Sequence, residues 1–187
     1  QTASSDSLKI SQQLPTVEVE KVHIGHAMQT LVLKPLMPAQ HAPEVMEANF
    51  ASLDLRSRGL NDLQSDLSVR GSTFDQVHVV VDGIPFTDPQ TGHHSAILPI
   101  PIEAIQEITV LPSGGSYRYG PFAFAGVVEL RSLDARSGRG YASASTGAFG
   151  YTRAAGGVPL RRTDRFGSRL DLSYTASDGA SPNTDFA

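Results

Sequence analysis

The chain has 187 residues, of which 40% are hydrophobic and 18% charged, and its formal net charge is -4. This length allows one ordinary globular core, or a small core with an appendage. The acidic balance, with no basic patch beyond Arg161 and Arg162, argues against a nucleic-acid partner. The absence of cysteine excludes disulfides and thiol chemistry. No apolar run approaches the roughly 20 residues of a membrane helix, so insertion into a membrane would require strands.

The N-terminal segment is polar over residues 1–13 and rich in Ser and Gln, which predicts disorder. A short stretch of different character follows, made of Thr16, Val17, Glu18, Val19 and Glu20. Its two valines alternate with polar residues, and this period of two predicts a strand-forming segment. We therefore expect a flexible N-terminal arm that carries one strand-like peptide.

The first ordered elements are a helix and two strands. Residues 42–50 are predicted to form the helix, because Pro43 suits a first helical turn and Glu44 suits the positive end of the helix dipole. Alternation of apolar and polar residues predicts a strand over residues 53–56, and another is expected over residues 67–71.

The centre of the chain is the most apolar part. Residues 77–81 are β-branched almost throughout, which predicts a strand buried on both faces. Asp82 and Gly83 follow it with a turn signature. The apolar spacing over residues 101–107 predicts one or two helical turns. Further strands are expected over residues 108–111 and 126–130.

After residue 137 the composition changes to two long alternating stretches, residues 141–155 and 168–176, joined by the polar, basic residues 159–167. In the second stretch, apolar residues share one side and polar residues the other. The apolar side holds Leu170, Leu172, Tyr174 and Ala176, and the polar side holds Arg169, Asp171, Ser173 and Thr175. Each stretch is long enough for a transmembrane β-strand, although a solvent-exposed hairpin would show the same alternation.

Four motifs follow one another within residues 58–130. They are Val69-Arg70-Gly71, the run Val79-Val80-Val81-Asp82-Gly83-Ile84-Pro85, the segment over residues 105–111, and the run Tyr119-Gly120-Pro121-Phe122-Ala123-Phe124-Ala125-Gly126-Val127-Val128. In their order and spacing, these motifs resemble the plug of TonB-dependent outer-membrane receptors.

The resemblance implies an α+β fold: a small mixed four-stranded-sheet plug with short helices, followed by the first antiparallel strands of an incomplete transmembrane β-barrel. It divides the chain into a flexible N-terminal segment over residues 1–26, a plug domain over 27–134 and the start of the barrel over 135–187. Two or three strands do not close a barrel. We therefore expect either a piece of a longer receptor or a plug module with a remnant of barrel.

The same resemblance assigns roles to individual residues. It places the Ton box, which pairs with the energy-coupling protein TonB by β-augmentation, at the strand-like peptide of residues 16–20. It places a latch between plug and barrel at Arg70, Gly71, Asp82 and Gly83, with Arg70 paired to acidic residues of the barrel. It gives substrate-facing loops the residues Ser72, Phe74, Asp88, His93, His94 and Tyr117. Imidazole and carboxylate groups could bind a metal chelate, but solvated loop histidines are the commoner case, and no resident metal or cofactor is expected.

The resemblance implies an outer-membrane protein whose plug lies in the barrel lumen, with the N-terminus in the periplasm. Its function would be TonB-driven uptake of a scarce nutrient, such as an iron chelate, a cobalamin-like compound or a glycan. The alternative is a free-standing periplasmic binding or interaction module with a plug-like fold. The sequence contains no Gly-x-Gly-x-x-Gly, Gly-x-x-x-x-Gly-Lys, His-Glu-x-x-His or Gly-x-Ser-x-Gly motif, so no enzymatic activity is expected.

Overall fold

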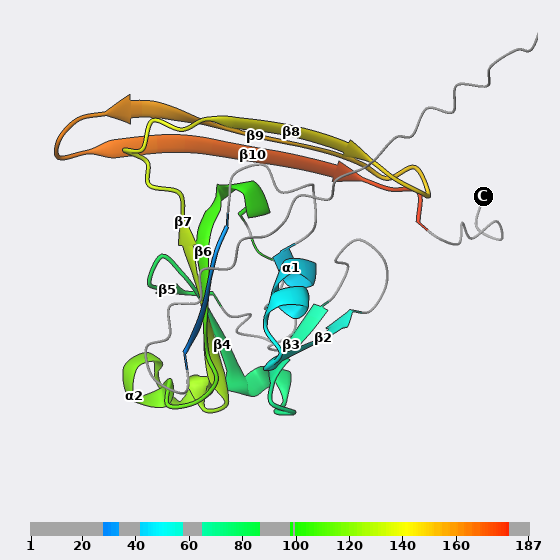
Figure 1. Ribbon diagram of the computed structural model, residues 1–187, viewed down its shortest axis with the longest axis vertical. Helices are drawn as coiled ribbons and strands as arrows, with labels where there is room; N and C mark the ends of the chain where they lie inside the picture. The colour runs from blue at the N-terminus through cyan, green and yellow to red at the C-terminus, as the bar shows by residue number, and fades with distance from the viewer. Residues whose placement is uncertain (1–27, 34–41, 58–64, 87–97, 99, 180–187) are drawn as a thin grey trace, which may run out of the picture.

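The computed structural model describes residues 28–33, 42–57, 65–86, 98 and 100–179. Figure 1 shows two parts within these ranges: a body built from the residues up to about 133, and a long sheet that lies across one end of this body. The predicted Ton box and the loop residues Asp88, His93 and His94 lie outside the described residues.

The body is organised around a mixed sheet with the strand order β1-β6-β7-β4-β5. Its strands are β1 (Gln29–Val32), β4 (Val77–Val81), β5 (Ile84–Pro85), β6 (Ile105–Leu111) and β7 (Gly126–Ser132). The pairing of β4 with β7 is parallel, and the other pairings are antiparallel. The predicted small mixed sheet is therefore confirmed, with five strands in the described part because β5 turns back onto β4 in a two-residue hairpin.

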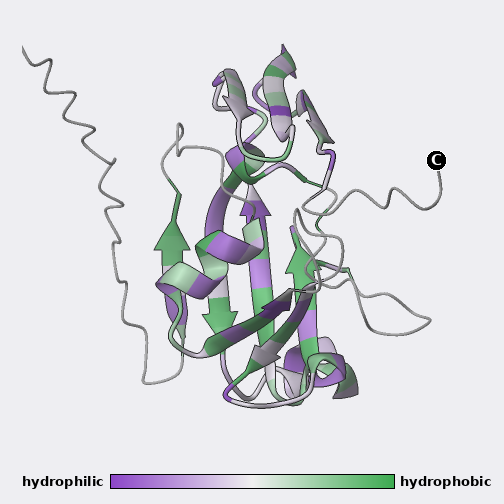
Figure 2. Ribbon diagram, turned by 90° about the vertical axis from the view of Figure 1, so that its right-hand side faces the viewer, coloured by the Kyte–Doolittle hydropathy of each residue, from purple (hydrophilic) through white to green (hydrophobic). Residues whose placement is uncertain are grey.

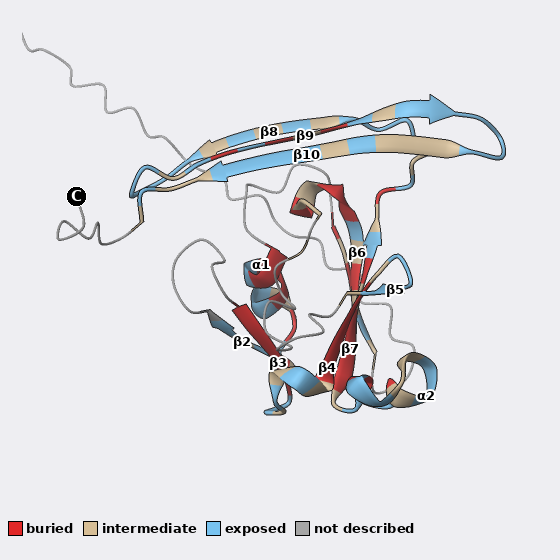
Figure 3. Ribbon diagram, turned by 180° about the vertical axis from the view of Figure 1, so that it is seen from behind, coloured by how far each residue is buried: buried red, intermediate tan, exposed pale blue. Residues whose placement is uncertain are grey.

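The main core fills one face of this sheet. Helix α1 (Ala42–Asn49) and the hairpin of β2 (Leu53–Ser57) with β3 (Ser65–Val69) supply its cover, through buried side chains such as Met46 and Leu67. The hydrophobic residues of the strands are visible in Figure 2, and the buried strands β4, β6 and β7 stand out in Figure 3. Helix α1 and strand β2 agree with the sequence prediction.

A second, smaller core lies on the opposite face, where Val80, Ala123 and Val127 pack together. The short helices α2 (Ser116–Tyr119) and η3 (Pro121–Ala123) cover this face. Val79 contributes to the main core and Val80 to the second core, and both are fully buried. Strand β4 is thus buried on both faces, as its unbroken run of β-branched residues predicts.

Two short 3-10 helices precede the central strands, η1 (Phe74–Gln76) before β4 and η2 (Ile102–Ala104) before β6. The prediction of one or two helical turns over residues 101–107 was wrong beyond Ala104, because β6 already begins at Ile105. Strand β6 pairs with β7 and buries Ile105, Ile108 and Val110, with a register shift between Ile105 and Glu107. Sheet pairing therefore overrides the weak helical spacing.

The long sheet contains β8 (Tyr141–Thr146), β9 (Thr152–Arg162) and β10 (Gly167–Ala176), paired antiparallel in the order β10-β9-β8. The prediction of a single strand over residues 141–155 was wrong, because a turn separates β8 from β9. Gly147 donates its N–H to the carbonyl of Tyr151 at 2.9 Å, and Phe149 has a positive φ of 55°. The predicted second strand over residues 168–176 is confirmed as β10.

Candidate functional site

The two dipeptides of the plug motifs adopt the same unusual backbone. Arg70 and Gly71 have φ values of 51° and 77°, and Asp82 and Gly83 have values of 50° and 81°. A glycine at the second position accepts this left-handed conformation without steric cost. Both motifs therefore form tight turns, and the Asp82-Gly83 turn joins β4 to β5.

Asp82 also connects the turn to the neighbouring strand. Its Oδ1 atom accepts a hydrogen bond from the N–H of Ser132 at 2.8 Å, and its own N–H donates to the carbonyl of Leu130 at 2.9 Å. These bonds hold the ends of the parallel strands β4 and β7 together. In the described residues, Asp82 thus acts inside the plug, at the point where the chain leaves it for β8.

Arg70 lies on the surface of the body with an exposed side chain. Its N–H donates to the carbonyl of Ser52 at 2.9 Å, which ties the turn to the start of the β2–β3 hairpin. The assignment of Arg70 and Gly71 to a latch with acidic residues of the barrel stays a prediction.

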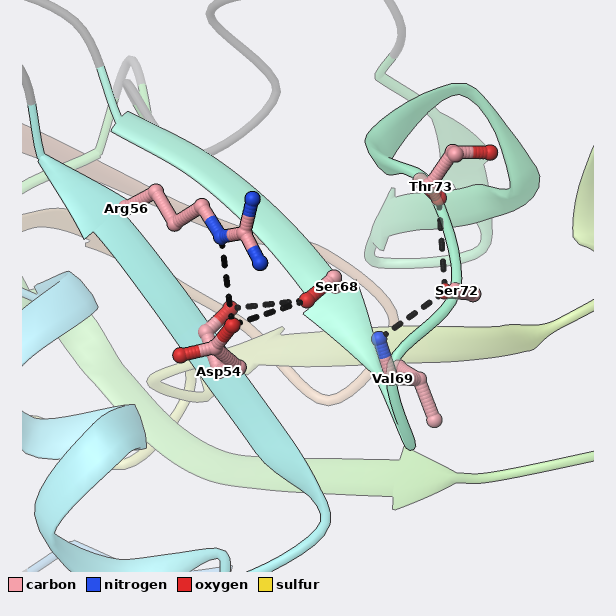
Figure 4. Close-up of polar contacts among 6 residues, drawn as sticks. All are labelled: Asp54, Arg56, Ser68, Val69, Ser72 and Thr73. Atoms are coloured by element: carbon pink, nitrogen blue, oxygen red, sulfur yellow. Dashed lines mark hydrogen bonds and ion pairs between the residues drawn. The ribbon is translucent and has the colours of Figure 1, made fainter.

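Figure 4 shows the polar contacts around this turn. The hydroxyl of Ser72 accepts a hydrogen bond from the N–H of Val69 at 3.0 Å and donates to the carbonyl of Thr73 at 3.3 Å. On the adjacent hairpin, Asp54 accepts hydrogen bonds from Arg56 and Ser68 at 3.4 Å. Ser72, predicted to face substrate, therefore uses its side chain to close its own turn.

Two further predicted substrate residues belong to the described part, and one of them, Tyr117, is in α2, which lies at the end of the body remote from β8–β10 (Figure 1). Phe74 in η1 is half-buried, and Tyr117 in α2 is 88% exposed. The N–H of Ala125, which follows η3, donates to the carbonyl of Gln76 in η1 at 3.0 Å, so η1 lies beside the segment that continues from α2. Phe122 and Phe124 are also exposed here, so aromatic side chains dominate this end.

Tyr119, from the closing plug motif, fastens α2 to the sheet. Its hydroxyl donates to the Oε2 atom of Glu129 on β7 at 3.2 Å, and its ring lies 5.1 Å from the guanidinium carbon of Arg118. Burial and the negative charge of Glu129 raise the pKa of Tyr119. The hydroxyl therefore stays protonated and serves as a donor.

The contact between the body and the long sheet contains a buried ion pair that the sequence did not predict. Glu103, in η2, receives two hydrogen bonds from the guanidinium of Arg153 on β9, one from Nη1 to Oε1 and one from Nη2 to Oε2 at 2.7 Å. Ser143 on β8 donates to the same Oε1 atom at 2.7 Å. The side chains of Arg153 and Glu103 are only 6% and 5% exposed.

This arrangement controls the charge of Glu103. Burial alone would raise the pKa of its carboxyl, but the hydrogen bonds from Arg153 and Ser143 outweigh burial and hold the pKa below its ordinary value. Glu103 is therefore ionised at neutral pH and forms a bidentate, charge-assisted pair with Arg153. The sequence shows that Arg153 is flanked by small residues and Glu103 by apolar ones, which indicates that both charges lie close to buried positions. No pattern in the sequence indicates that the two residues pair with each other.

A second polar cluster lies on the same side of the long sheet. Arg169 donates from Nε and Nη2 to Asp171, each at 2.7 Å, and its guanidinium carbon lies 6.0 Å from the ring of Tyr141. Tyr141 and Asp171 both pair with Gly157, one from each neighbouring strand. A side chain at Gly157 would overlap both neighbours, so the glycine provides the space in which they meet.

The opposite side of the long sheet is apolar and uncovered. The exposed large hydrophobic residues of β9 and β10 are Val158, Leu160, Leu170, Leu172 and Tyr174. Leu170 pairs with Val158, and Leu172 and Tyr174 pair with the small residues Gly156 and Ala154. The sheet thus has a polar face toward the body and an apolar face away from it, as the alternation in the sequence indicates.

Neither a metal site nor a helical membrane span is found in the part of the chain that the structure describes. No group of three or more His, Asp or Glu side chains there is arranged to hold a metal ion. No helix there has the length and apolar character to cross a membrane.

Comparison with known proteins agrees with these features. Residues 36–127 match the family model of the TonB-dependent receptor plug domain. This match covers α1, the β2–β3 hairpin, β4 to β6, α2 and η3, and it reaches the start of β7, whereas β1 lies before it. Residues 36–127 therefore form a TonB-dependent receptor plug domain.

Solved structures show the same fold. The ferric yersiniabactin uptake receptor FyuA from Yersinia pestis superposes with a TM-score of 0.62 at 19% identity, over 79% of this chain and 23% of that one. The copper transporter OprC superposes with a TM-score of 0.64 at 16% sequence identity, over 88% of this chain and 26% of that one. The unliganded ferric citrate transporter FecA superposes with a TM-score of 0.60 at 20% sequence identity, over 80% of this chain and 25% of that one. The chain thus spans about a quarter of the length of these proteins, and at such identities the likeness establishes the fold alone.

Proposed function

We propose that this chain forms the plug and the first wall strands of a TonB-dependent outer-membrane transporter. The plug closes the pore of the barrel, and energy from the TonB complex opens it for the uptake of a scarce nutrient. The observation that carries this proposal is the two-faced sheet β8–β10, whose polar face is joined to the plug by the buried pair of Glu103 and Arg153.

A wall strand of a membrane barrel alternates between side chains that face lipid and side chains that face the lumen. Strand β10 meets this requirement, with Leu172 and Tyr174 65% and 68% exposed on one face, and Asp171 on the other in a nearly buried ion pair. A free-standing periplasmic module would leave this apolar face in water, where large uncovered apolar patches are rare. The geometry therefore favours the transporter over the module.

The partners and location follow from the same proposal. TonB would bind the strand-like peptide of residues 16–20 by β-augmentation, from the periplasmic side. The plug, over residues 27–134, would lie in the lumen of the outer-membrane barrel that begins at residue 135. The similar proteins are described as transporters or receptors of ferric yersiniabactin, copper and ferric citrate, which supports a metal chelate as the cargo over a cobalamin-like compound or a glycan.

Fractionation of cells that produce the complete receptor tests the proposal. We expect the receptor in the outer membrane, and we expect a strain that relies on it for ferric citrate or another ferric chelate to lose uptake when TonB is deleted. A variant with Val17 replaced by Pro should lose uptake while it stays in the outer membrane, because proline removes a backbone donor from the augmented strand. A product found only in the soluble periplasm would instead support the free-standing module.

A further inference from the structure

The plug is fastened to the long sheet at one end of its two central strands. Glu103 lies two residues before β6, and Leu133 directly follows β7. The N–H of Leu133 donates to the carbonyl of Ala104 at 2.8 Å, so both strands are tied together where Glu103 meets Arg153. A force on this ion pair is therefore transmitted to the whole centre of the sheet.

Among the ion pairs of the described residues, the pair of Glu103 and Arg153 combines burial with a link between distant segments. Arg169 and Asp171 are nearly buried but are neighbours on one strand. Arg131 and Glu107 lie on two strands, but the side chain of Arg131 is 62% exposed. Arg56 with Asp54 and Arg136 with Asp134 are pairs between near neighbours in sequence, and all four of their side chains are more than half exposed. Exposed pairs contribute little to stability. Glu103 and Arg153 lie 50 residues apart and are almost fully buried, so separation of the two would leave an uncompensated buried charge.

The other end of the same strands has no such fastening in the described residues. There α2 and η3 present Tyr117, Phe122 and Phe124, which are 88%, 64% and 71% exposed. Figure 1 places this end away from β8–β10. In the described residues, the ion pair of Glu103 therefore joins the plug to the wall at one end of the central strands and not at the other.

We propose that Glu103 and Arg153 are positioning residues that keep the plug seated on the wall in the closed receptor. Arg153 contributes the positive charge from the wall, and Glu103 contributes the negative charge from the plug. The hydroxyl of Ser143 donates a further hydrogen bond to the carboxylate of Glu103. In the latch expected at Arg70 the arginine belongs to the plug, whereas here the arginine belongs to the wall. The two contacts are therefore separate. The inference rests on the proposed function, because it requires that the plug lies inside the pore of a barrel.

The test measures the leak of the closed receptor, which requires no knowledge of the cargo. The complete receptor is produced in cells that lack TonB, and vancomycin, which an intact outer membrane excludes, reports the leak. Glu103→Gln and Arg153→Gln should each lower the inhibitory concentration by about tenfold, because a buried charge without its partner favours the unseated plug. The exchanged double variant, Glu103→Arg with Arg153→Glu, should restore most of the barrier. Arg56→Gln, at an exposed pair, should behave as the unaltered receptor.

A covalent bond offers a second test that does not depend on the charges. The sequence contains no cysteine, so Glu103→Cys with Ser143→Cys can be joined by a short bifunctional thiol reagent. The double-cysteine receptor should leak before the reaction and seal after it, while its barrel keeps its heat-modifiable mobility on gels throughout.

Deletion of the plug, residues 28–132, separates the inference from the proposed function. If the plug-deleted receptor leaks while both single Gln variants remain sealed, the seat assigned to Glu103 and Arg153 is wrong and the proposed function stands. If the plug-deleted receptor is itself sealed, the plug does not close a pore and the proposed function fails. A leak in Arg56→Gln equal to that in Glu103→Gln would also overturn the inference.

Discussion

The carboxylate of Asp82 accepts a hydrogen bond from the N–H of Ser132 at 2.8 Å, across 50 positions of sequence. The bond joins the turn after β4 to the last residue of β7, where the chain leaves the plug for the wall. It explains why an aspartate, and not only a turn-forming residue, precedes Gly83. The side chain completes the parallel pairing of two strands whose own ladder ends at Val81 and Leu130.

Asp82→Ala should destabilise the plug by about 1–2 kcal/mol, because the N–H of Ser132 loses its acceptor and alanine is strained in the left-handed backbone of this position. Asp82→Asn keeps an oxygen acceptor and tolerates the left-handed backbone, so its cost should be clearly smaller. The measurement is urea unfolding of the receptor variants, with hydrogen exchange at Ser132 as the local readout. Equal losses for Ala and Asn would show that the charge of the carboxylate, rather than its acceptor oxygen or the left-handed backbone, matters at this position.

The sequence predicted the plug better than the wall, for a physical reason that particular strands show. Strand β4 was predicted residue for residue, because five successive residues that are almost all β-branched have no competing structure. The turn between β8 and β9 was missed, because the small residues around it give a weak alternation that continues through the turn. Register and turn position in such a segment depend on tertiary contacts.

Of the two turns of the site, the sequence predicted Asp82-Gly83, whose two residues favour a turn by themselves. Arg70 and Gly71 were instead placed in a strand over residues 67–71, but β3 ends at Val69 and both residues have positive φ values. The pair of Glu103 and Arg153 requires the fold to bring together residues 50 positions apart. The sequence indicates that each charged residue could be buried, but it does not identify the oppositely charged partner that compensates the cost of burial.

Gly157 and Gly156 form a matched pair of positions on β9. A side chain at Gly157 would overlap Tyr141 and Asp171, whereas at Gly156 the nearest atom would be the carbonyl oxygen of Tyr141 at 3.6 Å. Gly157→Ala should therefore cost about 1–3 kcal/mol through overpacking. Gly156→Ala should be neutral or stabilise by up to about 1 kcal/mol, because a strand glycine loses more conformational freedom on folding than alanine does.

The two variants are compared by urea unfolding of the receptor in lipid, under identical conditions. Because they differ by one position on the same strand, a general effect of alanine on β9 would change both equally. A difference in sign or of more than about 1 kcal/mol supports the close approach of Tyr141 and Asp171 over Gly157. Equal effects would mean that the two side chains move aside without cost.

Leu172 and Ser173 are neighbours that point to opposite faces of β10. If the apolar face contacts lipid, Leu172→Arg should cost about 2–4 kcal/mol near the middle of the bilayer and should lower the amount of folded receptor in the outer membrane. Ser173→Arg adds the same charge on the polar face and should have little effect on assembly. The amounts are measured by heat-modifiable mobility of the receptor in membrane fractions. Equal tolerance of both changes would argue against a lipid-facing surface on β10.

The ion pair of Glu103 makes the contact between plug and wall sensitive to acid. Its pKa is lowered, so the folded receptor binds this proton more weakly than the unfolded chain does. The stabilisation is therefore fully present above the ordinary glutamate value of 4.5 and is lost as the pH falls through the lowered pKa. Protonation removes the charge that Arg153 requires, and the contact should open before the rest of the plug unfolds.

Hydrogen exchange at the amides of η2 and β9 measures this opening between pH 6 and pH 3, after correction for the intrinsic pH dependence of exchange. We expect protection of these amides to fall with acid in the unaltered receptor. Glu103→Gln should show low protection at every pH in this range, because its side chain does not titrate. Glu47→Gln, at an exposed carboxylate of α1, is the matched control and should keep the acid dependence of the unaltered receptor. The same acid dependence in Glu103→Gln would assign the transition to another group.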